Sequence, residues 1–166
     1  LLWVDAGLVP DMQRLPGGAL CVHIDDDGLL AAGGGSGRVW ISRADAPFGH
    51  YLAHEGRVEA IDRRGSVVLS GGTDTRVVRA DLDAEQVQTL VGHVDGVTAV
   101  ALVDAQRVAS ASADGAVKLW DVASGKVRWS CRLAGGGPIL ALAVLDGHLL
   151  VSGRDRSVRV LDLEDG

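Results

Sequence analysis

Short runs of apolar residues that alternate with polar or small residues recur along the chain. They occupy residues 20–24, 58–61, 97–102 and 139–144, and each is followed by a polar turn and a run of small residues. Runs of about five residues with a period of two, separated by turn residues, are typical of short antiparallel strands. No stretch has a helical period of useful length, so the pattern predicts an all-β fold.

One unit repeats at an interval of about 40 residues. Ser70 and Asp74 lie in a segment that is echoed around Ser110 and Asp114, 40 residues later in both cases. Segment 149–158 repeats the unit with Ser152 as the equivalent serine and one turn residue fewer, and segment 29–39 is a degenerate first copy. A repeat of about 40 residues that carries four strands predicts a β-propeller blade.

The third copy contains Gly92-His93, then Ser110, Asp114 and the Trp120-Asp121 pair. With these residues it resembles the WD-repeat signature in full. The other copies are partial. The second copy has His54, Ser70 and Asp74 but Ala80 in place of Trp. The fourth copy has Ser152 and Asp155, but it has Leu161 in place of Trp and no His. The first copy matches by spacing alone. The resemblance implies an all-β propeller of four-stranded antiparallel blades.

The same spacing divides the chain into blades. We expect residues 1–15 to be the tail of a preceding blade, 16–53, 54–91 and 92–133 to be blades, and 134–166 to be an incomplete blade. About four blades are therefore expected, whereas the WD-repeat family commonly closes with seven. Because blades bury their faces only against neighbours, we interpret the chain as part of a longer ring.

Composition narrows the choice of partners. A chain of 166 residues can form one domain with a real core. The net charge is −6, from 16 basic and 22 acidic residues without a basic block, which argues against nucleic-acid binding. No apolar run reaches the roughly 18 residues of a membrane span. Cys21 and Cys131 are far apart in apolar runs, which favours buried reduced thiols and an intracellular location, in the cytoplasm or nucleus.

His93, Ser110 and Asp114 are the residue types of a catalytic triad. The resemblance implies instead that they form a structural hydrogen-bond line with Trp120, because buried polar groups that are fully paired can rigidify a blade. An indole donor six residues after the Asp has no role in a hydrolase, so we favour the structural interpretation. The same structural role is expected of the remaining set: His54, Ser70, Asp74, Ser152 and Asp155.

Three further clusters suggest chemistry but have simpler explanations. Residues 33–37 are rich in glycine, yet a β-run follows them where a phosphate loop needs a helix. Residues 25–28 lack the ligand spacing of a calcium loop and are expected to form a hairpin turn. Arg154, Arg156 and Arg159 favour a solvated turn, with a contact to an acidic or phosphorylated partner as the alternative. No metal site and no cofactor are predicted.

We therefore expect a non-catalytic scaffold that binds proteins or peptides on the propeller face. The resemblance implies contact residues in two places: near the start of the first strand of each copy, and just before the Asp in the turn that follows the second strand. These residues are Arg57, Glu59, Thr73, Thr98, Ala113, Leu140 and Arg154. One alternative is the substrate-receptor propeller of an F-box-type ubiquitin ligase, with ligase components as partners. A regulatory propeller attached to an enzyme is another, and an enzyme built on a propeller is a third.

Overall fold

The computed structural model describes residues 2–4, 11–13, 18–43, 46–134 and 137–166, of which 2–4, 11–13, 43 and 46–48 are described in their backbone alone. The described residues form seventeen strands and no helix. The all-β fold expected from the alternating runs is thereby confirmed.

Three of the sheets have four antiparallel strands each, in chain order. The first blade comprises β3 (Ala19–Ile24), β4 (Leu30–Gly34), β5 (Arg38–Arg43) and β6 (Ala46–Leu52). The second blade comprises β7 (Val58–Arg64), β8 (Val67–Gly72), β9 (Arg76–Asp81) and β10 (Gln86–Val91). The third blade comprises β11 (Val97–Leu102), β12 (Arg107–Ser112), β13 (Ala116–Asp121) and β14 (Lys126–Arg132).

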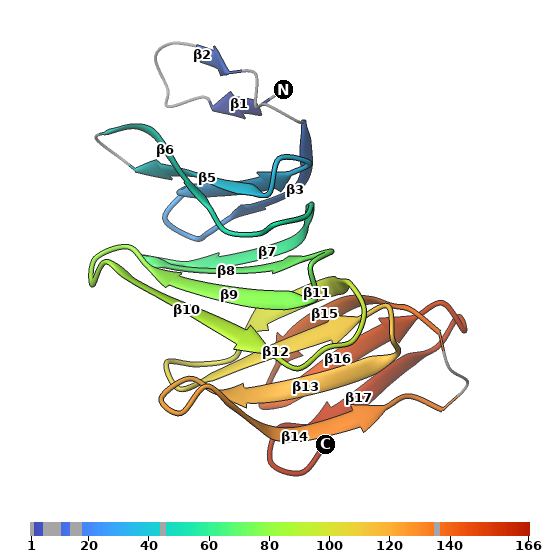
Figure 1. Ribbon diagram of the computed structural model, residues 1–166. Helices are drawn as coiled ribbons and strands as arrows, with labels where there is room; N and C mark the ends of the chain where they lie inside the picture. The colour runs from blue at the N-terminus through green and yellow to red at the C-terminus, as the bar shows by residue number, and fades with distance from the viewer. Residues whose placement is uncertain (1, 5–10, 14–17, 44–45, 135–136) are drawn as a thin grey trace.

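Two smaller sheets flank these blades. The fourth blade has three strands, β15 (Ile139–Leu145), β16 (His148–Gly153) and β17 (Val158–Asp162), and β1 (Leu2–Val4) pairs with β2 (Asp11–Gln13). The sheets stack in chain order, as the blades of an open propeller do (Figure 1). The first strands of successive blades, β3, β7, β11 and β15, contact one another along the stack.

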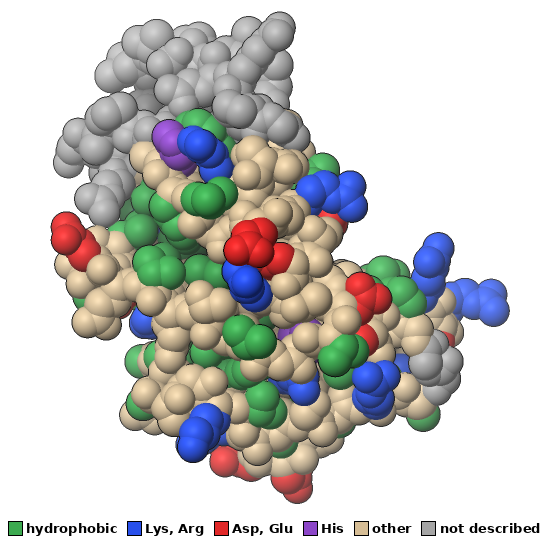
Figure 2. Space-filling view, viewed as in Figure 1, with side chains coloured by type: hydrophobic (Ala, Val, Ile, Leu, Met, Phe, Trp, Pro, Cys, Tyr) green, Lys and Arg blue, Asp and Glu red, His purple; other side chains and the backbone are tan. Residues whose placement is uncertain are grey.

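The stacked sheets have two edges that differ in their loops. We call the edge with the turns β8–β9, β12–β13 and β16–β17 and the connections between blades the top face, and the opposite edge, with the β7–β8 and β9–β10 hairpins, the bottom face. The top face lies to the right in Figure 1. In Figure 2, basic side chains protrude at the right-hand margin, over the β16–β17 turn.

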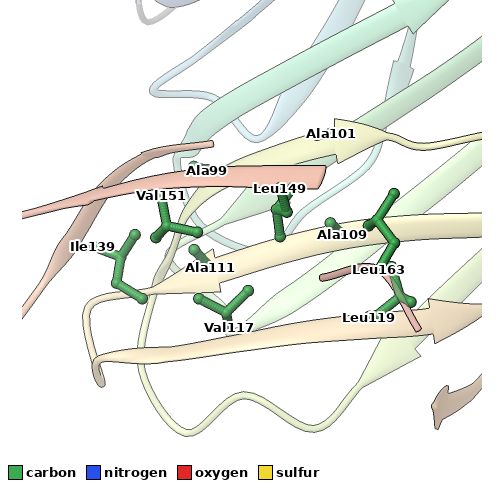
Figure 3. Packing of buried hydrophobic residues seen from close by; sticks show 10 residues of the cluster. All are labelled: Ala99, Ala101, Ala109, Ala111, Val117, Leu119, Ile139, Leu149, Val151 and Leu163. Atoms are coloured by element: carbon green, nitrogen blue, oxygen red, sulfur yellow. The ribbon is translucent and has the colours of Figure 1, made fainter. Parts of the chain in front are cut away.

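The core lies between neighbouring blades. The cluster between the third and fourth blades contains Ala109 and Ala111 of β12 and Leu149 and Val151 of β16 (Figure 3). The small residues of the second strands have a steric cause. A Cβ atom at Gly33 would overlap Val58 of the next blade, and one at Gly71 would overlap Val97. Second strands therefore need Gly, Ala or Ser where the next blade packs most closely.

Candidate partner-binding face

A line of buried hydrogen bonds crosses the third blade just below the top face. Trp120 Nε1 donates to Ser110 Oγ over 2.8 Å, and His93 Nε2 lies 2.7 Å from the same oxygen. His93 Nδ1 lies 3.6 Å from Asp114 Oδ2. Gly92 packs against the edge of the indole ring. A Cβ atom on Gly92 would lie only 3.1 Å from Trp120 Cη2. The side chains of the expected structural line are thus next to one another.

The burial of this line accounts for its chemistry. Ser110 is 0% exposed, and its oxygen is already engaged by both the indole and the imidazole. Burial lowers the pKa of His93, against the opposing field of the Asp114 carboxylate. The Asp114 carboxylate accepts backbone hydrogen bonds from Val94 and Ala116, which lower its pKa although burial opposes them. A serine without access to substrate cannot act as a nucleophile, so the geometry favours a structural role.

The second blade has the same line without the indole. His54 Nε2 lies 2.9 Å from Ser70 Oγ, and His54 Nδ1 lies 2.9 Å from Asp74 Oδ1. Asp74 Oδ2 also accepts a hydrogen bond from the backbone of Glu55, on the connection to the previous blade. Burial would raise the pKa of Asp74, but the bonds from His54 and Glu55 lower it. The turn carboxylate therefore fixes the connection that enters each of these blades.

The fourth blade departs from the sequence prediction at Ser152. Each first strand carries a β-bulge near its start, and with that register Ser110 pairs with Val100 whereas Ser152 pairs with Ala141. The fourth-blade equivalent of Ser110 is Val151, and Ser152 is the equivalent of Ala111. The spacing to the turn Asp is therefore unchanged, and the prediction of a turn one residue shorter is wrong. Because a shift of one residue moves a side chain to the other face of a sheet, Ser152 cannot join such a line.

Asp155 occupies the expected turn but has different partners. Its carboxylate accepts hydrogen bonds from the Ser157 hydroxyl, over 2.7 Å, and from Arg159 Nη2, over 2.7 Å. These bonds lower the pKa of Asp155 to about 2. Arg154 and Arg156 are exposed on the same turn. The guanidinium of Arg159, which lies on β17, is thus held against the turn, and the other two arginines face solvent.

Three expected contact residues meet at the top of the second blade. Two hydrogen bonds of 2.9 Å each join Arg57 to Thr73: the Arg57 amide donates to the Thr73 hydroxyl, and the Thr73 amide donates to the Arg57 carbonyl. Arg57 Nε lies 3.2 Å from Glu59 Oε1, with the two side chains 62% and 33% exposed. These three residues form an exposed polar group on a backbone that is held in place.

The expected contacts in the third and fourth blades are less uniform. Thr98 uses its hydroxyl internally, donating to the carbonyl of Ile139 over 2.5 Å and so joining the two blades. Ala113 is half-buried, and its amide donates to Gly96. Leu140 is 56% exposed, and Arg154 is exposed with its amide bonded to Pro138. The hydroxyl of Thr98 is therefore committed to the fold.

Sequence reasoning missed a polar group at the bottom of the first strands. Arg63 is 3% exposed and donates to the carbonyls of Leu30 and Ser42, both in the first blade. His23 Nδ1 lies 3.3 Å from Asp62 Oδ1, and Asp62 Oδ2 accepts the amide of Leu102 in the third blade. The available signal was the charged run 62–64 at the end of a strand that begins with alternating apolar residues.

The other clusters take simple forms. Asp25 Oδ1 accepts the amides of Asp27 and Leu29 and so closes the β3–β4 hairpin. Burial raises the pKa of the Cys21 thiol to about 11, and Cys21 and Cys131 are both free.

Within the described ranges, no group of three or more His, Cys, Asp or Glu side chains is placed to hold a metal ion. No helix long and apolar enough to cross a membrane occurs in that part of the chain.

Comparison with known proteins adds to this geometry. The family model "WD domain, G-beta repeat" matches residues 84–121, which run from the turn before β10 to the end of β13. An uncharacterised WD repeat-containing protein of Schizosaccharomyces pombe is 29% identical over 85 residues. That match covers 51% of this chain but only 14% of the relative's length.

Solved structures show the same fold. The crystal structure of the computationally designed Ika4 protein has a TM-score of 0.77 and 22% identity, with 92% of this chain and 95% of that chain covered. The designed Ika8 protein also has a TM-score of 0.77, with 21% identity, covering 88% of this chain and 46% of the other. Residues 84–121, which contain the His-Ser-Trp line, are thus similar to a WD repeat, and the stacked antiparallel sheets show that the chain has a β-propeller fold.

Proposed function

We propose that the chain is a non-catalytic scaffold that binds proteins or peptides on its top face. The observation that carries this proposal is the exposed group of Arg57, Glu59 and Thr73. The Arg57 side chain is 62% exposed and the Glu59 side chain 33% exposed, while two hydrogen bonds between Arg57 and Thr73 hold this part of the chain in place. Recognition residues on a rigid support lose less conformational entropy on binding than residues on a free loop.

The character of the top face supports a polar partner. Arg57 and Glu59 offer one charge of each sign, and Arg154 and Leu140 of the fourth blade add a cation and an apolar side chain. A mixed surface of this kind suits a protein or peptide with both charged and apolar side chains. The buried serines Ser70 and Ser110 supply no nucleophile to that surface, which favours binding over catalysis.

Affinity capture from a cell lysate tests the proposal. Three forms of the protein are compared: the wild type, the double variant Arg57→Ala with Arg154→Ala, and the control Arg128→Ala, which removes an exposed arginine from β14. We expect proteins captured by the wild type to be retained by the control and lost with the double variant. Identical captures by all three forms, or turnover in a hydrolase screen that is lost in Ser110→Ala, would overturn it.

A further inference from the structure

We infer that the bottom face carries a second docking site, for a peptide segment of a partner protein with a bulky apolar side chain beside a carboxylate. The site is a groove between the second and third blades, which we call the interblade groove. It has a volume of about 200 Å³ and is lined by Arg64, Val67, Arg79, Leu102, Asp104 and Ala105.

The groove has an apolar floor of limited size. Leu102 is buried, Val67 is half-buried and Ala105 is exposed on the β11–β12 turn. Pockets for small-molecule ligands usually measure about 300–1,000 Å³. A groove of about 200 Å³ is smaller, and an apolar floor that stays open to solvent suits a single apolar side chain of a partner.

Arg64 supplies the positive charge for the carboxylate that lies beside the apolar side chain in the partner peptide. It is exposed, and one of its Nη2 protons bonds the Leu102 carbonyl over 3.2 Å, which holds the guanidinium at the rim. Among the described residues, no carboxylate lies within ion-pair distance of Arg64. A guanidinium keeps further N–H donors in a planar fork that matches a carboxylate.

The other charges that line the groove already have partners. Arg79 Nη2 lies 3.6 Å from Asp81, and Asp104 accepts from Arg107 Nε over 2.8 Å. Arg64 is therefore the cation of the groove that retains capacity for an anion.

The surroundings of Arg64 limit the charge of the partner. A second hollow, of about 250 Å³, borders Arg64 on the side of the first blade and is lined by Asp25, Asp26 and Asp27. These carboxylates would repel a polyanion such as a nucleic acid or a cluster of phosphates. A single carboxylate that approaches Arg64 from the groove avoids them.

Nuclear magnetic resonance titration of the full chain with capped tetrapeptides tests this inference. The probe is Gly-Leu-Glu-Gly, with Gly-Leu-Gln-Gly lacking the charge, Gly-Ser-Glu-Gly lacking the apolar side chain, and inorganic phosphate as an anion alone. We expect Gly-Leu-Glu-Gly to shift the signals of Val67, Leu102 and Ala105, and to bind at least about tenfold more tightly than the other three.

Two variants locate the binding. Arg64→Gln should weaken it at least about tenfold while keeping a donor for the Leu102 carbonyl. Ala105→Glu, on an exposed turn, should abolish it by placing a carboxylate in the groove. Arg57→Ala with Arg154→Ala should leave it unchanged, so this site and the top face can fail separately. The inference falls if the glutamine peptide or phosphate binds as well as the glutamate peptide, if no peptide shifts these signals, or if Arg64→Gln binds like the wild type.

Discussion

The indole nitrogen of Trp120 donates to the hydroxyl oxygen of Ser110 over 2.8 Å, with both residues buried. The bond joins the third strand of the blade to the second, and His93 brings the connection from the previous blade to the same oxygen. Three segments thus depend on one hydroxyl group. Because a buried polar group without a partner costs free energy, the loss of any of these residues should destabilise the blade.

Removal of the indole should have the largest single effect. We expect Trp120→Ala to lower the free energy of unfolding by about 3–5 kcal/mol, the usual cost of emptying a large aromatic site in a core. Trp120→Phe keeps most of the apolar burial and should cost clearly less. Urea denaturation of both variants measures this. Equal losses would mean that the apolar volume that Phe retains contributes nothing to stability.

Ser110 and Ser152 should respond differently to the same substitution. Ser110→Ala leaves the Trp120 and His93 donors buried without their oxygen and should cost about 1–3 kcal/mol. Ser152 lies at the position of Ala111, so Ser152→Ala should stay within about 0.5 kcal/mol of the wild type. Thermal or urea unfolding of the pair decides the register, and a large loss for Ser152→Ala would contradict the equivalence of Ser152 and Ala111.

The turn carboxylates of the third and fourth blades should also differ. Asp114 holds the amides of Val94 and Ala116 with its side chain 6% exposed, and Asp114→Ala should cost about 1–3 kcal/mol. Asp155 is solvent-facing, and water can replace its role, so Asp155→Ala should shift the melting temperature less. Calorimetry of the two variants measures the shifts, and equal values would remove the argument for a buried network in the third blade.

Acidification should destabilise the fold in two stages. The pKa of His93 is lowered from 6.5, so below about pH 6.5 the unfolded chain takes up a proton that the folded chain does not, and stability falls. The pKa values of Asp74 and Asp114 are lowered from 3.8, so their contribution is present above about pH 4 and is lost as the pH falls further. Unfolding measured between pH 7.5 and 3 tests this, and His93→Gln should flatten the upper stage of the loss of stability.

The outer face of the fourth blade should cause self-association of this 166-residue chain. Val158 and Val160 of β17 are 70% and 62% exposed, and Leu145 of β15 is 57% exposed. Among the described strands, β17 also has no neighbour on its outer edge, which leaves backbone groups free to pair with another chain. Val158→Lys with Val160→Lys should shift the chain toward monomer in sedimentation experiments. A compact monomer for the unmodified chain at high concentration would contradict this expectation.

The sequence by itself determined the strand repeat, the propeller class and the line around Trp120. These features rest on local patterns: alternation of apolar residues, turn residues at regular intervals, and polar residues that recur 40 positions apart. Ser70 and Ser110 take equivalent places in their blades because the complete spacing to Asp74 and Asp114 is preserved in both copies.

Only the tertiary structure decided the face of Ser152, the burial of Arg63 and the use of the Thr98 hydroxyl. The register of the fourth blade depends on which residue of β16 lies opposite the bulge of β15, and matching serines by type alone shifted it by one. Arg63 is buried because its partners are carbonyls of the first blade, and Thr98 donates to a carbonyl of the fourth. Backbone carbonyls have no signature in the sequence, so contacts between blades become visible only once the sheets are stacked.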